Sequence, residues 1–237
     1  MPEIKENEIR NATIDAIYWW NRSEHYYHHY FSKIDAIHKN PDTFKFFVQK
    51  IFMTFLSDYS VRRNLSSGED SVYEFIDGLL KYSFISECRD GNLKIIDEIS
   101  KKLHHSKVTK NSTVSLLSKI AFLINPSSYS LYDSLSRKSL YKLKNKESQF
   151  THSDIQEYSR FLEEVLNLKK RIMTDGHSKF IQSILQEYKQ TKAYEFFRKH
   201  ETAFELRVVD KILWIKSTER EIDNSGYLSL LLYNEGE

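Results

Sequence analysis

Cysteine, proline and glycine are all scarce in this chain of 237 residues. Cys88 is the only cysteine, so a single chain can form neither an internal disulfide bond nor a cysteine-based zinc site. Six glycines and three prolines are too few for a turn-rich β-protein. No apolar run is long enough for a membrane span, and the opening MPEIKENEIR does not resemble a secretory leader. We therefore expect a soluble, cytoplasmic protein that does not engage a membrane.

Apolar residues are plentiful and mostly follow helical spacing. They make up 40% of the chain, and aromatic residues make up 14%, which is ample for a hydrophobic core. One clear stripe runs from Phe44 to Phe55, after Asn40-Pro41-Asp42, where Asp42 can cap the helix. The pattern predicts an all-α fold of eight to ten helices, arranged as one large domain or one domain with two lobes.

Positive charge is concentrated between Lys101 and Lys146. This segment holds ten basic residues and a single acid, Asp133, so its formal charge is +9. The whole chain carries only +2, which leaves −7 for the remainder. A surface that gathers positive charge in this way favours a polyanion, and we expect a nucleic-acid backbone.

The same part of the chain has the pattern of three successive helices. Their predicted ranges are 92–103, 112–124 and 133–144, and a short polar loop, HHSKVTKNS, separates the first two. Asp133 falls at or next to the N-cap of the third helix. An aspartate in that position is far more often a helix cap than a catalyst, so the position alone does not identify a catalytic group.

The stretch SLLSKIAFLINPSSYSLYDSLSRKSL, within residues 92–145, resembles the centre of the helix-hairpin-helix DNA glycosylase superfamily, which includes the 8-oxoguanine glycosylase fold. In that family a hairpin of two helices binds DNA phosphates. Members that also cut the strand have a lysine near the start of the second helix. The catalytic aspartate lies at the start of the next helix. By resemblance Lys119 stands at the lysine position, Asp133 at the aspartate and Arg137 at the following basic residue. The resemblance implies a two-lobed, all-α domain over residues 1–237.

Two departures from the family pattern affect these assignments. The hairpin loop has no glycine, whereas the family's loop is glycine-rich so that backbone N–H groups can approach a phosphate. The interval from Lys119 to Asp133 is also a few residues shorter than usual. Lys107 and Lys110 can replace the loop's backbone contacts with side-chain contacts, while the short interval affects Lys119 more than Asp133.

The implied chemistry is hydrolysis of the bond between a base and its sugar. Positive charge builds up on the deoxyribose as this bond breaks, and a carboxylate beneath the sugar stabilises it. Asp133 is the candidate catalytic carboxylate, because a helix start and nearby basic residues favour its ionised form. Lys119 is a second candidate, since a lysine that reaches the sugar can form a Schiff base and cut the strand. The short spacing favours an enzyme that stops at an abasic site.

A dense aromatic and histidine stretch, YWWNRSEHYYHHYF, occupies residues 18–31. Glycosylases flip the target base out of the duplex and hold it by stacking and edge hydrogen bonds, so part of this stretch can line a base pocket. The candidates for that pocket are Trp19, Trp20, Tyr27, His28 and Tyr30. Aromatic residues at helical spacing are usually core residues, however. His25 and His29 lack an acidic partner at metal-binding spacing, so we expect no metal and no cofactor.

The partner that this interpretation predicts is double-stranded DNA with a damaged or modified base, bound by a monomer. We expect phosphate contacts from Lys107, Lys110, Arg137 and Lys138. By resemblance alone, divergent members of this fold act in bacterial antiviral defence and remove modified bases such as glucosylated hydroxymethylcytosine from phage DNA. A pocket rich in aromatic and histidine side chains would suit a base that bears a sugar.

Two other classes of protein fit parts of the sequence. Arg22 and His28 form an Arg-x5-His pair that resembles the loose signature of HEPN-type ribonucleases, in which two subunits meet at an RNA-cutting cleft. A non-catalytic nucleic-acid-binding module would use the basic segment alone and would need neither Asp133 nor the histidines. The chain has no Walker A motif, no dinucleotide-binding GxGxxG motif and no serine nucleophile elbow.

Overall fold

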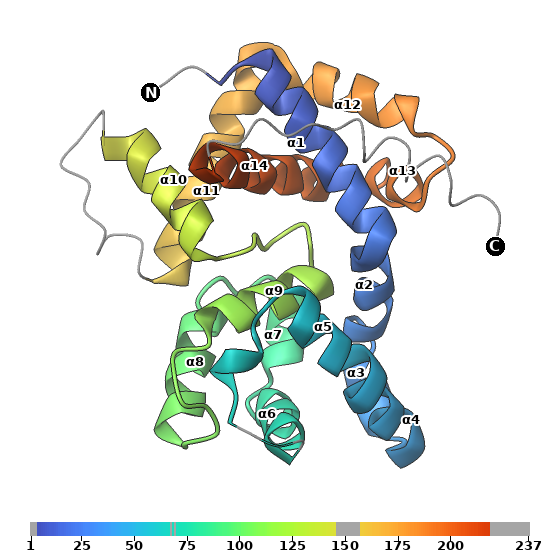
Figure 1. The fold of residues 1–237 in the computed structure, drawn as a ribbon, viewed down its shortest axis with the longest axis vertical. Coiled ribbons are helices and arrows are strands. Elements are labelled where there is room, and N and C mark those ends of the chain that lie inside the picture. Colours follow the sequence, from blue (N-terminus) through green and yellow to red (C-terminus); the bar gives the residue numbers. More distant parts are fainter. Residues whose placement is uncertain (1–3, 67, 69, 146–156, 219–237) are drawn as a thin grey trace. The chain divides into compact units, whose positions relative to one another are not determined.

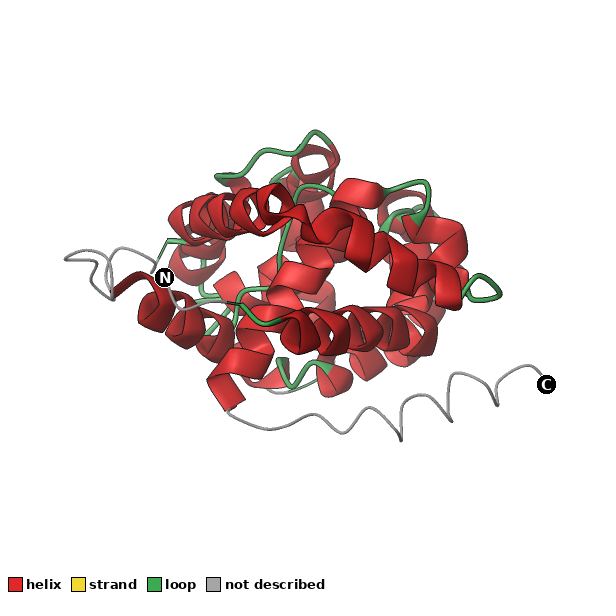
Figure 2. Cartoon of the chain, turned by 90° about the horizontal axis from the view of Figure 1, so that it is seen from above, coloured by secondary structure: helices red, strands yellow, loops and turns green. Residues whose placement is uncertain are grey.

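A computed structural model describes residues 4–66, 68, 70–145 and 157–218. Within them the chain is all-helical, with 78% helix and no strand (Figure 2), which confirms the all-α prediction. These residues form fourteen α-helical segments, α1 to α14. They outnumber the expected eight to ten helices, and several are short: α3 (Ile34–His38), α7 (Phe84–Arg89) and α13 (Lys192–Phe197) have only five or six residues. Lys146 lies outside the described residues.

The chain divides into two compact units (Figure 1). The terminal unit comprises residues 1–25, 133–156 and 160–237, and the central unit comprises 26–132 and 157–159. The basic segment is therefore shared: the part up to Tyr132 belongs to the central unit, and the part from Asp133 onward belongs to the terminal unit.

The terminal unit is built around one buried helix. Its elements are α1 (Glu6–Trp19), the π-helical turn η1 (Trp20–Glu24), α10 (Ser134–Asn145), most of α11 (Tyr158–Ile172), η5 (Met173–His177), α12 (Ser178–Glu187), α13 and α14 (Glu201–Thr218). α14 packs against α1, α10 and α13, and α1 also packs against α12. Gly176 adopts φ +88° in η5, which separates α11 from α12.

The central unit has an aromatic core. Its elements are α2 (His25–Phe31), α3, α4 (Pro41–Phe46), the π-helical turn η2 (Phe47–Phe52), α5 (Met53–Asp58), the short 3-10 turn η3 (Arg62–Asn64), α6 (Asp70–Lys81), α7, α8 (Ile95–His105) and α9 (Val114–Ile124). Phe31, Phe47 and Phe55 are fully buried, and Phe31 contacts Phe47 edge to face and Phe55 at a tilt. The cap of α4 is Asn40, not Asp42, because Pro41 occupies the first helical position and Asn40 accepts a hydrogen bond from the Thr43 amide at 3.0 Å.

The end of α8 explains how its loop folds without glycine. The Val108 amide donates to the Leu103 carbonyl and the Lys107 amide to the His104 carbonyl, each at 3.1 Å, which is the Schellman arrangement. Lys107 has φ +60° and so occupies the left-handed position in which glycine is usual. A residue with a Cβ takes this conformation at a cost of about 1 kcal/mol.

Replacing Lys107 with glycine or with alanine separates this backbone strain from the loss of charge. Both variants lose the ammonium group, but only glycine relieves the left-handed conformation. We expect Lys107→Gly to be more stable than Lys107→Ala by about 1 kcal/mol in urea unfolding. Equal stabilities would contradict a left-handed Lys107.

Candidate functional site

α14 carries charged residues although every face of the helix is buried. Arg207, Asp210 and Lys211 are 3%, 4% and 7% exposed, among neighbours such as Val208 and Ile212 that are fully buried. Charged groups in such surroundings are costly unless they are paired. Their partners define the site.

Arg207 joins two carboxylates. Its Nε donates to Glu24 Oε2 at 3.2 Å, its Nη2 donates to Glu24 Oε1, and its Nη1 donates to Asp210 Oδ2. Glu24 belongs to η1 and is fully buried. The second oxygen of Asp210, Oδ1, is buried and accepts no hydrogen bond from the part of the chain that the structure describes.

Lys211 forms a second ion pair beside an aromatic ring. Its Nζ lies 2.8 Å from Asp15 Oδ2 and 4.9 Å from the ring centroid of Trp19. The guanidinium of Arg22, an exposed residue, lies 5.1 Å from the same ring. Burial lowers the pKa of Lys211, the charge of Arg207 lowers it further, and Asp15 opposes both effects.

Asp133 is the N-cap of α10, and it also belongs electrostatically to this group of charges. Its Oδ1 accepts a hydrogen bond from the Ser136 amide at 2.8 Å, and its carbonyl accepts from the Arg137 amide at 3.1 Å. The side chain is half-buried. Its charge is close enough to Asp210 to raise the pKa of that carboxyl. The structure therefore supports the capping role directly and places the same carboxylate beside α14.

We call this set of residues the ionic cluster: Asp15, Glu24, Asp133, Arg207, Asp210 and Lys211. It holds four acids and two bases, so its formal charge is −2 when all are ionised. Burial raises the pKa of Asp210 to about 6; Arg207 and Lys211 oppose the rise, whereas Asp133 and Glu24 add to it. Two neighbouring carboxyl groups in unlike environments are an arrangement suited to proton transfer and to stabilising positive charge.

Lys119 lies in the central unit and is 5% exposed. Its Nζ donates to Ser115 Oγ at 3.0 Å, to the Ser115 carbonyl at 3.3 Å and to the Tyr132 carbonyl at 3.4 Å. The neighbouring Ser118 hydroxyl accepts a hydrogen bond from the Tyr132 amide at 3.1 Å. α9 therefore holds both backbone groups of the residue that precedes Asp133 in the sequence.

The five residues predicted for the base pocket are divided between the units. Trp20 is 1% exposed and stacks on Phe196 at 4.2 Å in the core of the terminal unit. Tyr27 is 2% exposed, and its hydroxyl donates to Asp58 at 2.6 Å in the central unit. Both side chains have structural partners, and neither has a free face for a base.

The other three candidates are more accessible. Trp19 is half-buried in the terminal unit, beside the ionic cluster. His28 and Tyr30 are half-buried in the central unit, where His28 Nδ1 donates to the Leu123 carbonyl at 2.7 Å. Arg22 and His28, the predicted ribonuclease pair, thus belong to different units. No group of three potential metal ligands occurs among the described residues.

Each unit contains two of the four predicted phosphate-binding residues. Lys107 and Lys110 are exposed on the loop after α8 in the central unit. In the terminal unit Lys138 is exposed and Arg137 is half-buried, both in the first turns of α10. Lys142, one turn further along, is exposed as well. Exposed lysines therefore follow Asp133 along its own helix.

The chain matches no protein-family model, no curated protein and no solved structure. Among its described helices, none has both the length and the apolar character to cross a membrane.

Five members of the ionic cluster are absent from the sequence-based predictions: Asp15, Glu24, Arg207, Asp210 and Lys211. One signal for the last three is present in the sequence AFELRVVDKILW, residues 203–214. Its apolar residues fall on every face of a helix, so its charged residues have no solvent-facing side. A helix of this kind must bury charges, and buried charges must find partners.

Replacing Asp210 with asparagine tests its raised pKa. The folded protein holds this proton more tightly than the unfolded chain, so the contribution of Asp210 to stability is present at acid pH and is lost as the pH rises through about 6. Between pH 4.5 and 7.5, the unfolding free energy of Asp210→Asn should gain about 2 kcal/mol relative to the unaltered protein. Urea unfolding at several pH values measures this, with the exposed Asp42→Asn as control. A difference that is independent of pH would contradict the assignment.

Proposed function

We propose that this chain is a DNA glycosylase that hydrolyses the N-glycosidic bond of a damaged or modified base, with Asp133 as its catalytic carboxylate. The observation that carries the proposal is the position of Asp133 in the terminal unit. Its half-buried carboxylate adjoins the buried charges of α14, and the exposed Lys138 and Lys142 follow on the same helix. The resemblance of residues 92–145 to the glycosylase superfamily supports the same assignment.

The electrostatics of the cluster suit this reaction. The departing base leaves positive charge on the deoxyribose, and a buried site with more acids than bases stabilises that charge more strongly than water does. Asp133 would contact the sugar. Asp210 would act through Asp133, since its protonation changes the charge next to that carboxylate.

Other residues of the terminal unit could bind the DNA backbone and the flipped base. Trp19 presents a half-buried ring that can stack on a flipped base. Lys138 and Lys142 can bind phosphates. The amine of Lys119 is engaged with the oxygens of Ser115 and Tyr132, which supports an enzyme that leaves an abasic site without cutting the strand.

Asp133→Asn separates catalysis from capping. Asparagine caps helices about as well as aspartate, so a purely structural Asp133 would tolerate the change. We expect base release to fall by about 100-fold or more, whereas stability changes by less than about 1 kcal/mol and DNA binding is retained. The assay is incubation with unmodified, 8-oxoguanine, uracil, alkylated and glucosylated-cytosine DNA, with free base and alkali-dependent breaks as readouts.

The matched control is Asp42→Asn, which removes an exposed carboxylate from the first turn of α4. Base release that persists in Asp133→Asn would refute the catalytic assignment. Breaks without alkali would require a lysine nucleophile and would overturn the monofunctional form. No product from any DNA would refute the glycosylase proposal and favour RNA cleavage, tested with His28→Ala, or binding without catalysis.

The two neighbouring tryptophans make a second test. Trp19→Ala should reduce base release but leave the affinity for unmodified DNA within about twofold, because a flipped base is its only expected DNA contact. Trp20→Ala should instead lose about 3–5 kcal/mol of stability, since it empties the core. Thermal unfolding and DNA binding of both variants distinguish the two roles. A Trp19→Ala variant that loses binding and base release equally would remove Trp19 from the pocket.

A further inference from the structure

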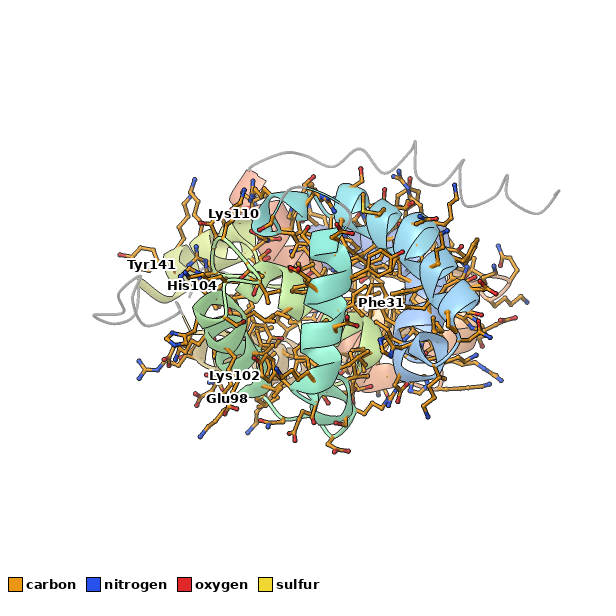
Figure 3. The ribbon with its side chains drawn as sticks, turned by 90° about the horizontal axis from the view of Figure 1, so that it is seen from below. Phe31, Glu98, Lys102, His104, Lys110 and Tyr141 are labelled. Atoms are coloured by element: carbon orange, nitrogen blue, oxygen red, sulfur yellow. The ribbon has the colours of Figure 1, made fainter. Side chains whose placement is uncertain are left out.

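The central unit contains a basic hollow formed by the end of α8 and the residue after α6. It has a volume of about 390 Å³ and is lined by Tyr82, Lys101, Lys102, His105 and Ser106. Lys102 stands on α8, four residues after Glu98, and Figure 3 labels both together with His104 and Lys110. We call this feature the Tyr82 hollow. Four of its five lining residues fall in the basic segment, and Tyr82 comes from another part of the sequence.

Close packing of α6 and α8 forms the hollow. Gly78 of α6 is buried, and a Cβ at that position would lie 2.7 Å from Leu103 Cδ2. The absence of a side chain therefore lets α8 approach α6 closely. Tyr82 follows one turn after Gly78, and Lys102 precedes Leu103, so this approach brings the tyrosine ring to the lysines.

The tyrosine ring positions two ammonium groups. Lys81 Nζ and Lys102 Nζ each lie 5.7 Å from the centroid of the Tyr82 ring. Attraction to the ring offsets part of the repulsion between the two cations. Lys101 and His105 of α8 add further donors.

Two exposed acids lie near the hollow. Glu98 precedes Lys102 by one turn of α8, and the sequence has no further acid from Ile99 to Tyr132. Lys101 Nζ lies 3.9 Å from Glu157, but both side chains are largely exposed, so the pair contributes little. The last carbonyls of α8 are bonded to the amides of Ser106, Lys107 and Val108, so the lysine side chains are not needed to cap the helix.

We propose that the Tyr82 hollow is a phosphate-binding subsite for the backbone of double-stranded DNA. Lys101 and Lys102 contact a phosphate, His105 is a further donor, and Tyr82 is a positioning residue that holds Lys102 in place. The exposed Lys107 and Lys110 on the adjoining loop extend the contact along the strand. The choice of double-stranded DNA rests on the proposed function, whereas the lysine contacts themselves require neither the ionic cluster nor base release.

The experiment measures binding of an unmodified, fluorescently labelled duplex of about 20 base pairs by anisotropy over a range of salt concentrations. Each lysine that contacts a phosphate adds about one to the slope of log affinity against log salt. The double variant Lys101→Gln/Lys102→Gln should therefore lower that slope by about two and weaken binding at least tenfold near 0.1 M salt.

The matched control is Lys39→Gln/Lys94→Gln, which removes two exposed lysines of the central unit outside the hollow. It should change the slope by less than half a unit. Equal effects of the two double variants would overturn the proposal, because they would reduce it to overall charge. Absence of binding by the unaltered protein would overturn it as well.

Tyr82 variants test the positioning role. Tyr82→Phe keeps the ring and should bind within about twofold of the unaltered protein, whereas Tyr82→Ala should lower the salt slope by about one, since Lys102 loses its support. An unchanged slope in Tyr82→Ala, with the protein folded, would refute this role. If the hollow lysines are needed for DNA binding but no DNA releases a base, the proposed function is refuted and the subsite is not. If the protein releases a base but the hollow lysines do not affect DNA binding, the subsite is refuted and the proposed function is not.

Discussion

The pairing of Arg207 with Glu24 is the constraint on which the terminal unit depends. Both groups are buried, and the guanidinium makes two hydrogen bonds to the carboxylate. Loss of either partner would leave a buried, uncompensated charge, which costs about 3–5 kcal/mol. The pair therefore fixes α14 against η1. Because Asp210 and Lys211 lie on the same helix, their positions beside Asp133 and Trp19 follow from this one interaction.

Stability alone does not account for the composition of the cluster. A buried ion-pair network can often be replaced by apolar residues of similar volume with no loss of stability. This network is also unbalanced, with four acids and two bases, and burial keeps the pKa of Asp210 well above its ordinary value, with Asp133 and Glu24 adding to the rise. Buried charged groups with a shifted pKa are typical of functional sites. The cluster has the character of a site, and the N-cap role of Asp133 is compatible with it.

Local sequence signals predicted the helices of the basic segment well. The expected ranges 92–103, 112–124 and 133–144 correspond to α8, α9 and α10, with Asp133 as the N-cap, because apolar spacing and capping residues act within a few residues. The ionic cluster depends on pairs such as Glu24 and Arg207, 183 residues apart, which no local pattern contains.

Trp19 and Trp20 show that a local sequence pattern also fails to distinguish two adjacent residues. Both belong to one aromatic stretch, yet Trp20 is buried against Phe196 and Trp19 is half-buried beside Lys211. Which face of a helix meets the core is decided by the elements that pack on it, here α13 and α14. Composition predicted an aromatic site but not which aromatic residue remains available.

The distribution of opposite charges in this protein would suit the glycosylase activity that we propose. The acid-rich cluster is buried, where a low effective dielectric constant strengthens its field on a cationic sugar, whereas the lysines are exposed, where each adds a small, salt-dependent attraction to phosphates. α10 combines both in one element, because Lys138 follows Asp133 by five residues, a rise of about 7.5 Å. A single rigid helix can therefore place one carboxylate at a sugar and an ammonium group at a neighbouring phosphate. This coupling of binding to charge stabilisation within one unit is the physical reason for favouring catalysis over capping at Asp133.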